Sequence, residues 1–320
     1  NTLSSQYETS NGLTTSGIWV IAGNAYDSKS NYLTSTDNGT TWTLRTLSGD
    51  QQFLGLGYGN GTFVMGGNEH KTTGIDNILT SSDGFSWTLR DSGLTDGLNG
   101  VTYGNNAFVI VSSEGQIFTS SDAVSWDNRT KYTGVWKDYL IDKQFNEVTF
   151  GNNTFVTVGQ YGVIVTSSDN GTSWDNRTSG STTAMLEDVA FGNNTFLATG
   201  CSSGCDGGII LSSSDNGTTW NDVTTVTNKT FGGVAYGNNT FVVVGELGTI
   251  LSSSDNGTTW DNRTDSSVTA RYLRHIGFGN DVFVAVGGNG TIVTSSDNGT
   301  TWTSRISGFS STLYNVIYSE

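Results

Sequence analysis

The chain has 320 residues, enough for one large β domain or two smaller ones, and has no run of about 18 apolar residues that could span a membrane. Its net charge of −15, from 29 acidic and 14 basic residues, argues against nucleic acid and anionic lipid as partners, since both bind basic surfaces. Charged residues are only 13% of the chain and aromatic residues 11%, which indicates a packed core rather than charge-driven disorder.

The first segment, residues 1–16, is a polar N-terminal extension (NTLSSQYETSNGLTTS) that need not belong to the folded domain. Residues 17–320 are the predicted domain, which begins with the strand-like segment SGIWVIAG. If the protein is exported, its signal peptide has been removed, because no basic-then-apolar leader opens the sequence.

A block of the form S-x-D-x-G-x-x-W then recurs along the chain. Its five full copies are Ser35–Trp42, Ser167–Trp174, Ser213–Trp220, Ser253–Trp260 and Ser295–Trp302. Two shortened copies, SSDGFSW and SSDAVSW, end at Trp87 and Trp126. The seven tryptophans are separated by 45, 39, 48, 46, 40 and 42 residues, and a near-constant period of this length predicts a repeat architecture.

A second repeated unit precedes the boxes, as in GVAYGNNTFVVVGELGTILSSSD from Gly233. It reads as strand, Gly-Asn-Asn turn, strand, short loop, strand, box, strand, with the β-branched and aromatic residues that strands favour. No segment has a sustained 3.6-residue period with helix caps, so we expect essentially no helix. Four antiparallel strands in each repeat of ~40–45 residues are typical of a propeller blade.

The two ends of the chain are predicted to share one blade. In the first repeat, Trp19 takes the position held elsewhere by Phe63, Phe108, Phe155, Phe196, Phe241 and Phe283, but no first strand precedes it. The matching strand, LYNVIYSE, is Leu313–Glu320 at the C-terminus. The predicted fold is therefore all-β: a seven-bladed β-propeller of four-stranded antiparallel blades, in which the C-terminal strand completes the N-terminal blade.

Seven such boxes in a propeller pattern resemble the Asp-box, or bacterial neuraminidase repeat, superfamily over nearly the whole chain. The resemblance implies that each box is a β-turn between the third and fourth strands, with the Asp bound to turn amides and the Trp packed beneath. The superfamily includes sialidases, xyloglucan hydrolases, sortilin-type receptors, photosystem II assembly factors and surface proteins. It therefore implies a fold without choosing an activity.

We expect no enzymatic activity, no catalytic residue and no cofactor. A sialidase needs three arginines that converge on a carboxylate, but six of the eight arginines follow a box Trp by three residues and so are spread around the ring: Arg45, Arg90, Arg129, Arg177, Arg263 and Arg305. A glycosidase needs two facing carboxylates at ~5–10 Å. No motif marks such a pair, and we interpret the acids outside the repeat, Glu187 among them, as solvated loop residues.

The two cysteines, Cys201 and Cys205, lie in TGCSSGCDGG. A local disulfide is the leading interpretation, with two free thiols or a metal site as alternatives. A metal site would need further ligands, and both histidines, His70 and His275, lie elsewhere in the sequence, so we expect no bound metal.

Irregular segments occur only in the second-to-third loops and the linkers between blades, which alternating strand directions place on one face of the disc. They are residues 24–31, 68–77, 131–145, 201–208 and 265–275. Variable loops on a rigid scaffold favour recognition. The candidate binding residues are Tyr132, Trp136, Tyr139, Arg271, Tyr272 and Arg274. Trp136 could stack on a sugar or anchor a partner, or it could only pack the insertion against the disc.

Fourteen Asn-x-Thr sequons are candidate glycosylation sites: Asn38, Asn60, Asn128, Asn152, Asn170, Asn176, Asn193, Asn216, Asn228, Asn238, Asn256, Asn262, Asn289 and Asn298. The alternative is that duplication of the repeat copied a few good turn sequences, since Asn-Gly suits hairpin turns without any sugar.

Our leading hypothesis is a non-enzymatic, extracellular or cell-surface module for recognition or assembly, such as a glycosylated subunit of a surface array or filament. Its partners would be further copies of itself, a cell-surface protein or glycans, with no nucleic acid and no membrane insertion. A carbohydrate-binding, lectin-like propeller and a glycoside hydrolase are the alternatives.

Overall fold

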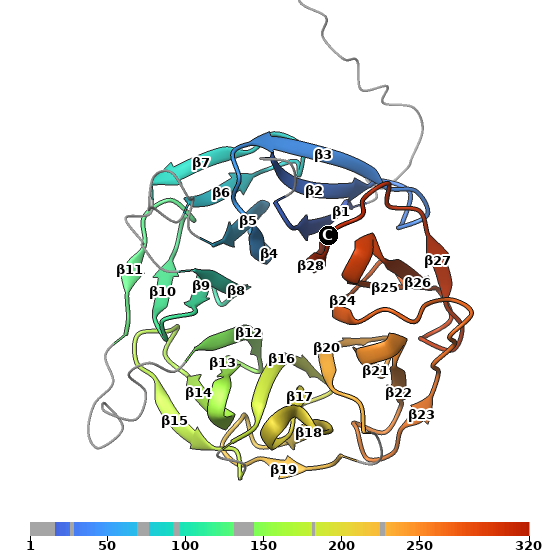
Figure 1. The fold of residues 1–320 in the computed structure, drawn as a ribbon. Coiled ribbons are helices and arrows are strands. Elements are labelled where there is room, and N and C mark those ends of the chain that lie inside the picture. The colour runs from blue at the N-terminus through green and yellow to red at the C-terminus, as the bar shows by residue number, and fades with distance from the viewer. Residues whose placement is uncertain are drawn as a thin grey trace, which may run out of the picture.

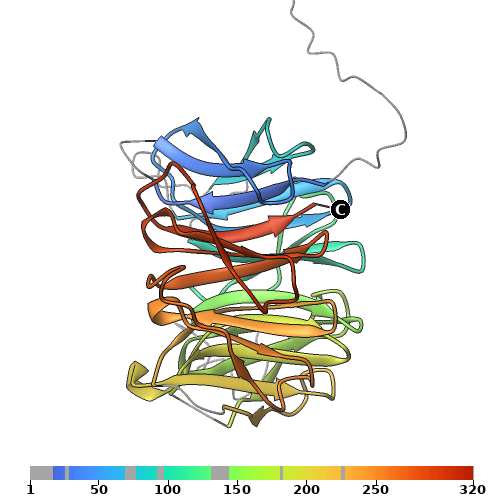
Figure 2. The same ribbon diagram turned by 90° about the vertical axis from the view of Figure 1, so that its right-hand side faces the viewer.

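A computed structural model describes residues 17–25, 29–68, 77–91, 97–130, 144–180, 183–224 and 228–319. These residues form seven four-stranded antiparallel sheets arranged as blades around a central axis (Figure 1). Seen edge-on, the strands run between the two faces of a flat disc (Figure 2). The predicted seven-bladed β-propeller is therefore confirmed.

The strands of each blade follow one another from the axis to the rim. The innermost strands are β28 (Leu313–Tyr318), β4 (Phe53–Gly59), β8 (Leu98–Gly104), β12 (Phe145–Gly151), β16 (Met185–Gly192), β20 (Phe231–Gly237) and β24 (Leu273–Gly279). The second strands are β1 (Trp19–Gly23), β5 (Thr62–Gly67), β9 (Ala107–Ser112), β13 (Thr154–Gly159), β17 (Thr195–Cys201), β21 (Thr240–Gly245) and β25 (Val282–Gly287).

The outer half of each blade is shorter. The third strands are β2 (Lys29–Ser35), β6 (Asn77–Ser81), β10 (Ile117–Ser120), β14 (Val163–Ser167), β18 (Gly208–Ser213), β22 (Ile250–Ser253) and β26 (Ile292–Ser295). The rim strands are β3 (Thr43–Ser48), β7 (Thr88–Asp91), β11 (Asp127–Asn128), β15 (Asp175–Thr178), β19 (Asn221–Asp222), β23 (Asp261–Asn262) and β27 (Thr303–Arg305).

Within the described residues, the helical turns are short 3-10 segments between second and third strands. They are η2 (Gln160–Gly162), η3 (Ser203–Cys205), η4 (Glu246–Gly248) and η5 (Gly288–Gly290). None of the described helices is long and apolar enough to cross a membrane.

The ring closes through the two ends of the chain, as the sequence predicts. Strand β28 pairs antiparallel with β1, with Tyr318 opposite Trp19 and Val316 opposite Ile21. The pairing gives the first blade its inner strand and covers the edge that β1 would otherwise expose, so the circle has no open sheet edge between the ends of the chain.

Repeated aromatic pairs fill the space between blades. An aromatic residue at or next to the end of each inner strand tilts against an aromatic residue of the second strand, for example Phe191 against Phe196 with ring centroids 4.6 Å apart. The same ring covers the glycine that ends the preceding inner strand, since a Cβ on Gly151 would lie 2.0 Å from the Phe191 ring. Each such ring buries apolar area worth about 2 kcal/mol, and the glycine lets the next blade approach closely enough for it to do so.

The S-x-D-x-G-x-x-W boxes are turns between third and rim strands, held by their own side chains. In the fourth full copy, Ser253 Oγ and the Thr259 amide and hydroxyl donate to the Asp255 carboxylate over 2.7 to 2.9 Å. The Gly257 amide donates to Ser253 Oγ at 2.8 Å. The seven Asp residues are therefore turn clamps at the rim, far from one another around the ring.

The arginines that follow the boxes are structural, as expected. Each donates from Nε to a Thr or Ser hydroxyl of the neighbouring third strand, for example Arg177 to Thr166 at 2.8 Å and Arg263 to Ser252 at 3.0 Å. These six arginines lie at the outer strands of six different blades and cannot form one anion site.

Candidate functional site

The inner strands leave their regular pairing at one place, two residues from their start. The register shifts between Phe145 and Glu147 in β12, and at the equivalent positions of the other six blades. A bulge of this kind re-aims side chains and is common beside binding sites. Because inner strands begin on the face that carries the linkers and second-to-third loops, the seven bulges surround the channel mouth on that face.

The bulges bring two rings of equivalent residues to the axis. The residues at the second position are Leu54, Asn99, Asn146, Glu187, Gly232, Arg274 and Tyr314. The residues at the third position are Gly55, Gly100, Glu147, Asp188, Gly233, His275 and Asn315. The third position is thus glycine in three blades and a polar side chain in four, and the second position varies as well, whereas the fourth position is Leu, Val or Ile in all seven blades.

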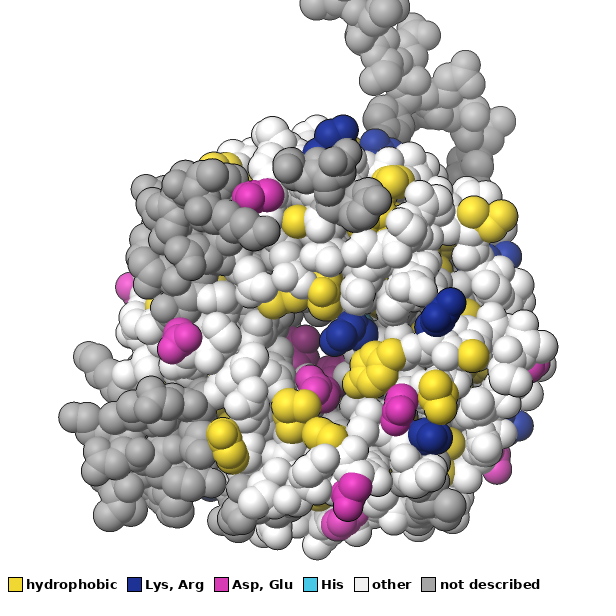
Figure 3. All heavy atoms as spheres, in the orientation of Figure 1, with side chains coloured by type: hydrophobic (Ala, Val, Ile, Leu, Met, Phe, Trp, Pro, Cys, Tyr) yellow, Lys and Arg dark blue, Asp and Glu magenta, His cyan; other side chains and the backbone are white. Residues whose placement is uncertain are grey.

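All seven residues at the second position, and Glu147, His275 and Asn315 at the third, line a cavity of about 220 Å³ on the axis, together with Gln144. In the space-filling view the middle of the face is hollowed, and acidic and basic side chains gather there (Figure 3). Glycine at the third position leaves room for neighbouring polar groups, because a Cβ on Gly100 would lie 2.5 Å from Glu147 Oε1. The glycines and the polar residues of this ring are therefore complementary.

Glu147 reaches from β12 toward the axis. Its Oε1 accepts the amide hydrogen of Val148 at 3.0 Å, while Oε2 has a long contact of 3.5 Å from the Asn315 amide across the channel. Burial, together with the nearby Asp188 carboxylate, raises the pKa of Glu147 well above its usual range. One carboxylate oxygen thus keeps spare acceptor capacity while it faces the cavity.

Asp188 lies deeper and is held by backbone. Its two oxygens accept amide hydrogens from Val189 at 2.7 Å and from Val234 of the next blade at 2.8 Å. Burial raises the pKa of Asp188, and the nearby His275 acts in the opposite direction. The hydroxyl of Thr199, which is opposite Asp188 in the sheet register, is buried with no hydrogen-bond partner among the described residues.

His275 completes the cluster. Its Nδ1 accepts the Val316 amide hydrogen over 3.4 Å, and its Nε2 is 3.9 Å from Asp188 Oδ2. Burial lowers the pKa of His275, so the ring is neutral near neutral pH. A neutral ring that accepts at Nδ1 carries its hydrogen on Nε2, which directs that hydrogen toward the carboxylate.

Donor atoms of Glu147, Asp188 and His275 all lie within 4.8 Å of one another, so they are the described residues that could approach a metal ion together. The histidine does not fit that role as it is held. A ligating ring normally donates through its second nitrogen, whereas here that nitrogen accepts a backbone hydrogen and Nε2 carries the proton. The cluster is better described as two carboxylates beside a hydrogen-bond donor.

The cavity rim carries one cation between aromatic rings. The Arg274 guanidinium lies 5.3 Å from the centre of the Tyr272 ring and 5.4 Å from that of Tyr314. Burial raises the pKa of the neighbouring Glu187, and Arg274 offsets this effect. Our interpretation of the acids outside the repeat as solvated loop residues is wrong for Glu187, because the bulge in β16 directs it into the cavity wall.

The structure separates the sequence-derived binding candidates. Tyr132, Trp136 and Tyr139 lie outside the described residues. Arg274 lines the cavity, and the Tyr272 ring contacts the Arg274 guanidinium. Arg271 instead lines a different hollow, between residues 268–271 and 304–310. Of the two arginines outside the repeat, only one therefore belongs to the axial site.

The sequons lie mainly in turns on the opposite face. Ten of the fourteen Asn residues have a left-handed backbone: Asn38, Asn60, Asn152, Asn170, Asn193, Asn216, Asn238, Asn256, Asn289 and Asn298. Several join neighbouring blades through their side chains, with Asn152 donating to Asn216 at 2.6 Å and Asn193 to Asn256 at 2.9 Å. These residues thus have structural roles that need no sugar, and glycosylation stays a prediction.

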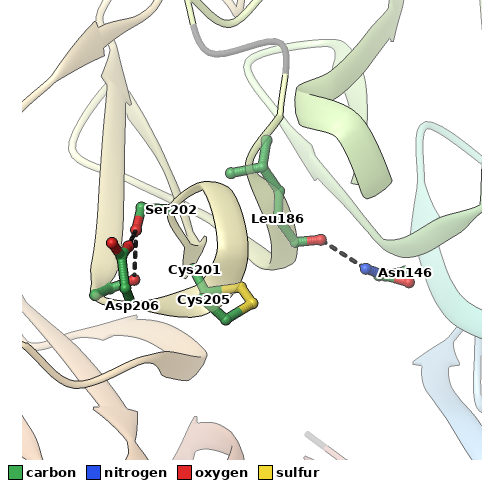
Figure 4. The surroundings of a disulfide bond; sticks show 7 residues. Asn146, Leu186, Cys201, Ser202, Cys205 and Asp206 are labelled. Carbon is green, nitrogen blue, oxygen red and sulfur yellow. Dashed lines mark hydrogen bonds between the residues drawn. A yellow bond between two sulfur atoms is a disulfide. The ribbon is translucent and has the colours of Figure 1, made fainter.

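Cys201 and Cys205 are joined in a disulfide at the end of β17 (Figure 4). The loop between them is also held by Ser202, whose hydroxyl donates to Asp206 at 2.7 Å. In the same view the Asn146 amide donates to the Leu186 carbonyl at 2.7 Å, which ties one inner strand to the next.

Sequence reasoning missed Glu147, Asp188, His275 and Asn315. A signal was present: aligned from their first apolar residue, the inner strands read FLGLGYG, LNGVTYG, FNEVTFG, LEDVAFG, FGGVAYG, LRHIGFG and LYNVIYS. The second and third columns vary in residue type, the third among Gly, Glu, Asp, His and Asn, while the first and fourth columns stay apolar and the sixth stays aromatic. Comparing copies column by column would have identified this ring.

No family model and no curated protein matches the chain. Among solved structures, YCF48 bound to D1 peptide aligns with a TM-score of 0.60 at 16% identity, covering 89% of this chain and 87% of that one. YCF48 from Cyanidioschyzon merolae aligns at 0.60 and 15%, covering 81% and 86%. A chain of the nidogen/laminin complex aligns at 0.58 and 9%, covering 95% and 99%. At these identities the likeness shows the propeller fold alone.

Proposed function

We propose that this protein is a non-enzymatic recognition module that binds a segment of a partner protein at the axial cavity. The observation that carries the proposal is the set of bulges around the axis: the second and third positions of the inner strands differ in type from blade to blade, whereas the first and fourth positions are apolar in all seven. The boxes and outer strands are engaged in holding the fold. Loops of variable length surround the same mouth, as expected for a recognition face.

The similar structures support a protein partner without identifying it. One of them is a propeller solved with a peptide, and another comes from a complex of two proteins. A cavity of about 220 Å³ accommodates a side chain or a short piece of chain rather than a folded domain. The partner would therefore present an extended segment or terminus, with the rim aromatic rings providing the surrounding contacts.

A displayed library of linear peptides tests this function. We expect selection on the purified protein to enrich peptides whose affinity falls at least tenfold, or about 1.4 kcal/mol, with Arg274→Ala or Tyr314→Ala. Arg271→Ala is the matched control, since it removes the same side chain three residues away and outside the cavity. No enrichment, or enriched peptides indifferent to both rim variants, would rule the proposal out.

A glycoside hydrolase is the second candidate, because Glu147 and Asp188 place two carboxyl groups with raised pKa values beside a cavity. Against it, Asp188 is buried and both its oxygens accept backbone amides, so it is poorly placed to attack or activate water at a sugar. Turnover of any member of a broad glycoside panel that Glu147→Gln abolishes would favour the enzyme. A glycan array tests the remaining lectin alternative.

We further propose that the module works outside the cell and belongs to the Asp-box superfamily. The acidic, sequon-rich sequence and the seven boxes support this. The intact mass of protein from its natural source would reveal attached glycans, and an unmodified mass would count against a glycoprotein. Assembly into an array is tested by negative-stain images of the full chain and of a chain without residues 1–16, where isolated discs in both would exclude it.

A further inference from the structure

The axial cavity has more negative than positive groups. Glu147, Glu187 and Asp188 face or underlie it, while Arg274 is the one cation at its wall among the described residues. His275 adds no charge, because burial lowers its pKa. A segment that enters from the linker face therefore meets an excess of carboxyl groups in a confined space, where charge interactions are stronger than in water.

The acids differ in how completely their oxygens are satisfied. Asp188 accepts two backbone hydrogens and faces Nε2 of His275. Glu187 is next to the Arg274 guanidinium, which offsets its negative charge. Glu147 has one oxygen, Oε2, whose single hydrogen-bond contact among the described residues is the long one from Asn315, and that oxygen points across the channel. An acceptor with spare capacity, Glu147 Oε2, thus faces the cavity that the seven inner strands surround on the axis.

A ligand group that carries both hydrogen-bond donors and positive charge would satisfy this Glu147 oxygen. A metal ion fits poorly, since His275 presents a proton rather than a lone pair. A basic side chain fits both needs: its ammonium or guanidinium group donates to Glu147, and its hydrocarbon stem can lie along the Tyr272 and Tyr314 rings near the mouth. Neutralising a buried carboxylate in this way removes an unfavourable charge.

We infer that the partner segment anchors in the channel through one basic side chain that pairs with Glu147. This rests on the proposed function and specifies its ligand. Glu147 lies beside Gly100 of the neighbouring blade, whose lack of a side chain leaves room for the Glu147 carboxylate, and Asn315 contacts this carboxylate from the far side of the channel. Asp188 and His275 form the floor beneath the pair.

The pairing has a defined pH dependence. A cation binds the ionised form of Glu147, whose pKa burial holds above its usual range. Affinity should therefore rise as the pH rises through that raised pKa, and then become constant. His275 does not reverse the trend, because protonation of its ring at low pH would add positive charge and so would also disfavour a bound cation. The other acids that face the site, Asp188 and Glu187, act in the same direction as Glu147.

The same peptide selection tests the inference separately from the proposed function. We expect the enriched peptides to share one Lys or Arg, and norleucine in place of a Lys to weaken binding at least tenfold. Glu147→Gln should weaken the Lys peptide equally and have no effect on the norleucine peptide, as a double-mutant cycle requires of a direct pair. Glu114→Gln is the control, since this exposed acid lies on the same face outside the cavity.

Failure of the inference would look different from failure of the function. Peptides that bind through the rim residues but lack a shared basic residue, or that bind Glu147→Gln as well as the wild type, would overturn the anchor and leave the recognition site standing. Stoichiometric binding of Zn²⁺ or Mn²⁺ that Glu147→Gln abolishes would also overturn it, by making the cluster a metal site. The norleucine arm leaves the protein unchanged, so misfolding cannot imitate the expected result.

Discussion

The two ends of the inner strands differ in how much their residues vary from blade to blade. Where an inner strand meets its first turn, each blade places an aromatic ring over its neighbour, and six of the seven strands end in the same glycine. Where the strand begins, equivalent positions carry Gly, Glu, Asp, His or Asn. The first end is closely packed between blades, so any change there disturbs a contact. The second opens on a cavity, so its residues can vary without breaking the ring.

The difference teaches where to look for function in a repeat protein. Residues that recur in all or nearly all blades, such as Asp255 and Arg263, form hydrogen bonds that hold their own blade together. Residues at positions that vary between blades, such as Glu147, are not needed to hold the blade together. Substitutions at the packed positions should therefore cost more stability than substitutions at the axis.

Adding one methyl group at the packed end should be costly. In Gly192→Ala the new Cβ would lie 2.0 Å from Cγ of Tyr236, whose ring is held against Phe241. We expect the free energy of unfolding, measured with denaturant, to fall by about 3 kcal/mol. Gly288→Ala is the control, because its nearest neighbour would be 3.9 Å away. Equal stability of the two variants would contradict the close-packing argument.

Removing a turn clamp should cost less. Asp255→Ala deletes the acceptor for Ser253 and Thr259, and we expect a loss of about 1 to 2 kcal/mol. The hydrogen bonds from Thr259 lower the pKa of Asp255. Its contribution is therefore present above the unfolded-state pKa and is lost as the pH falls through the lowered folded-state value, so the two proteins should converge in acid.

The control for the clamp is Asp261→Ala. This carboxylate is largely exposed and makes a surface ion pair with Arg263 at 2.8 Å. Such pairs contribute little, so we expect a change below about 0.5 kcal/mol. A loss as large as that of Asp255→Ala would show that any acid at the rim matters equally.

Neutralising the axial carboxylate should stabilise the fold. Burial raises the pKa of Glu147, so its contribution to stability is present below the unfolded-state pKa and is lost as the pH rises through the folded-state value. We expect Glu147→Gln to raise the melting temperature by about 2 °C at neutral pH and to leave it unchanged in acid. Glu114→Gln should match the wild type at both. A lower melting temperature for Glu147→Gln at neutral pH would show that the charge is structural.

The amide contacts between blades should give the smallest effect. Asn193→Ala removes the hydrogen bond to Asn256 of the next box. Asn60→Ala is the matched control: it has the same left-handed turn position, but the next box has Ala123 where others have Asn. We expect Asn193→Ala to be less stable than Asn60→Ala by about 0.5 kcal/mol in denaturant unfolding. Identical losses would mean that only the turn conformation matters.

Much of the fold was readable because it is local and repeated. Each box carries its own hydrogen-bond donors and acceptors, so its turn could be predicted from eight residues. The pairing between the two ends of the chain was predictable because the first repeat has no inner strand and the C-terminal strand belongs to no other repeat. The structure pairs Trp19–Gly23 with Leu313–Tyr318. The axial site was not predicted, because its members come from four blades and no short motif joins them.

The amino-acid sequence was therefore enough to predict the blades, their number and the closure of the ring, since strand periodicity and turn chemistry act between near neighbours. Only the tertiary structure decided that Glu147, Asp188, His275 and Asn315 share one axis. Closure of the ring places equivalent positions of distant segments around one axis. The bulge in each inner strand then turns the side chains at those positions into the channel. Neither effect is visible in any single repeat.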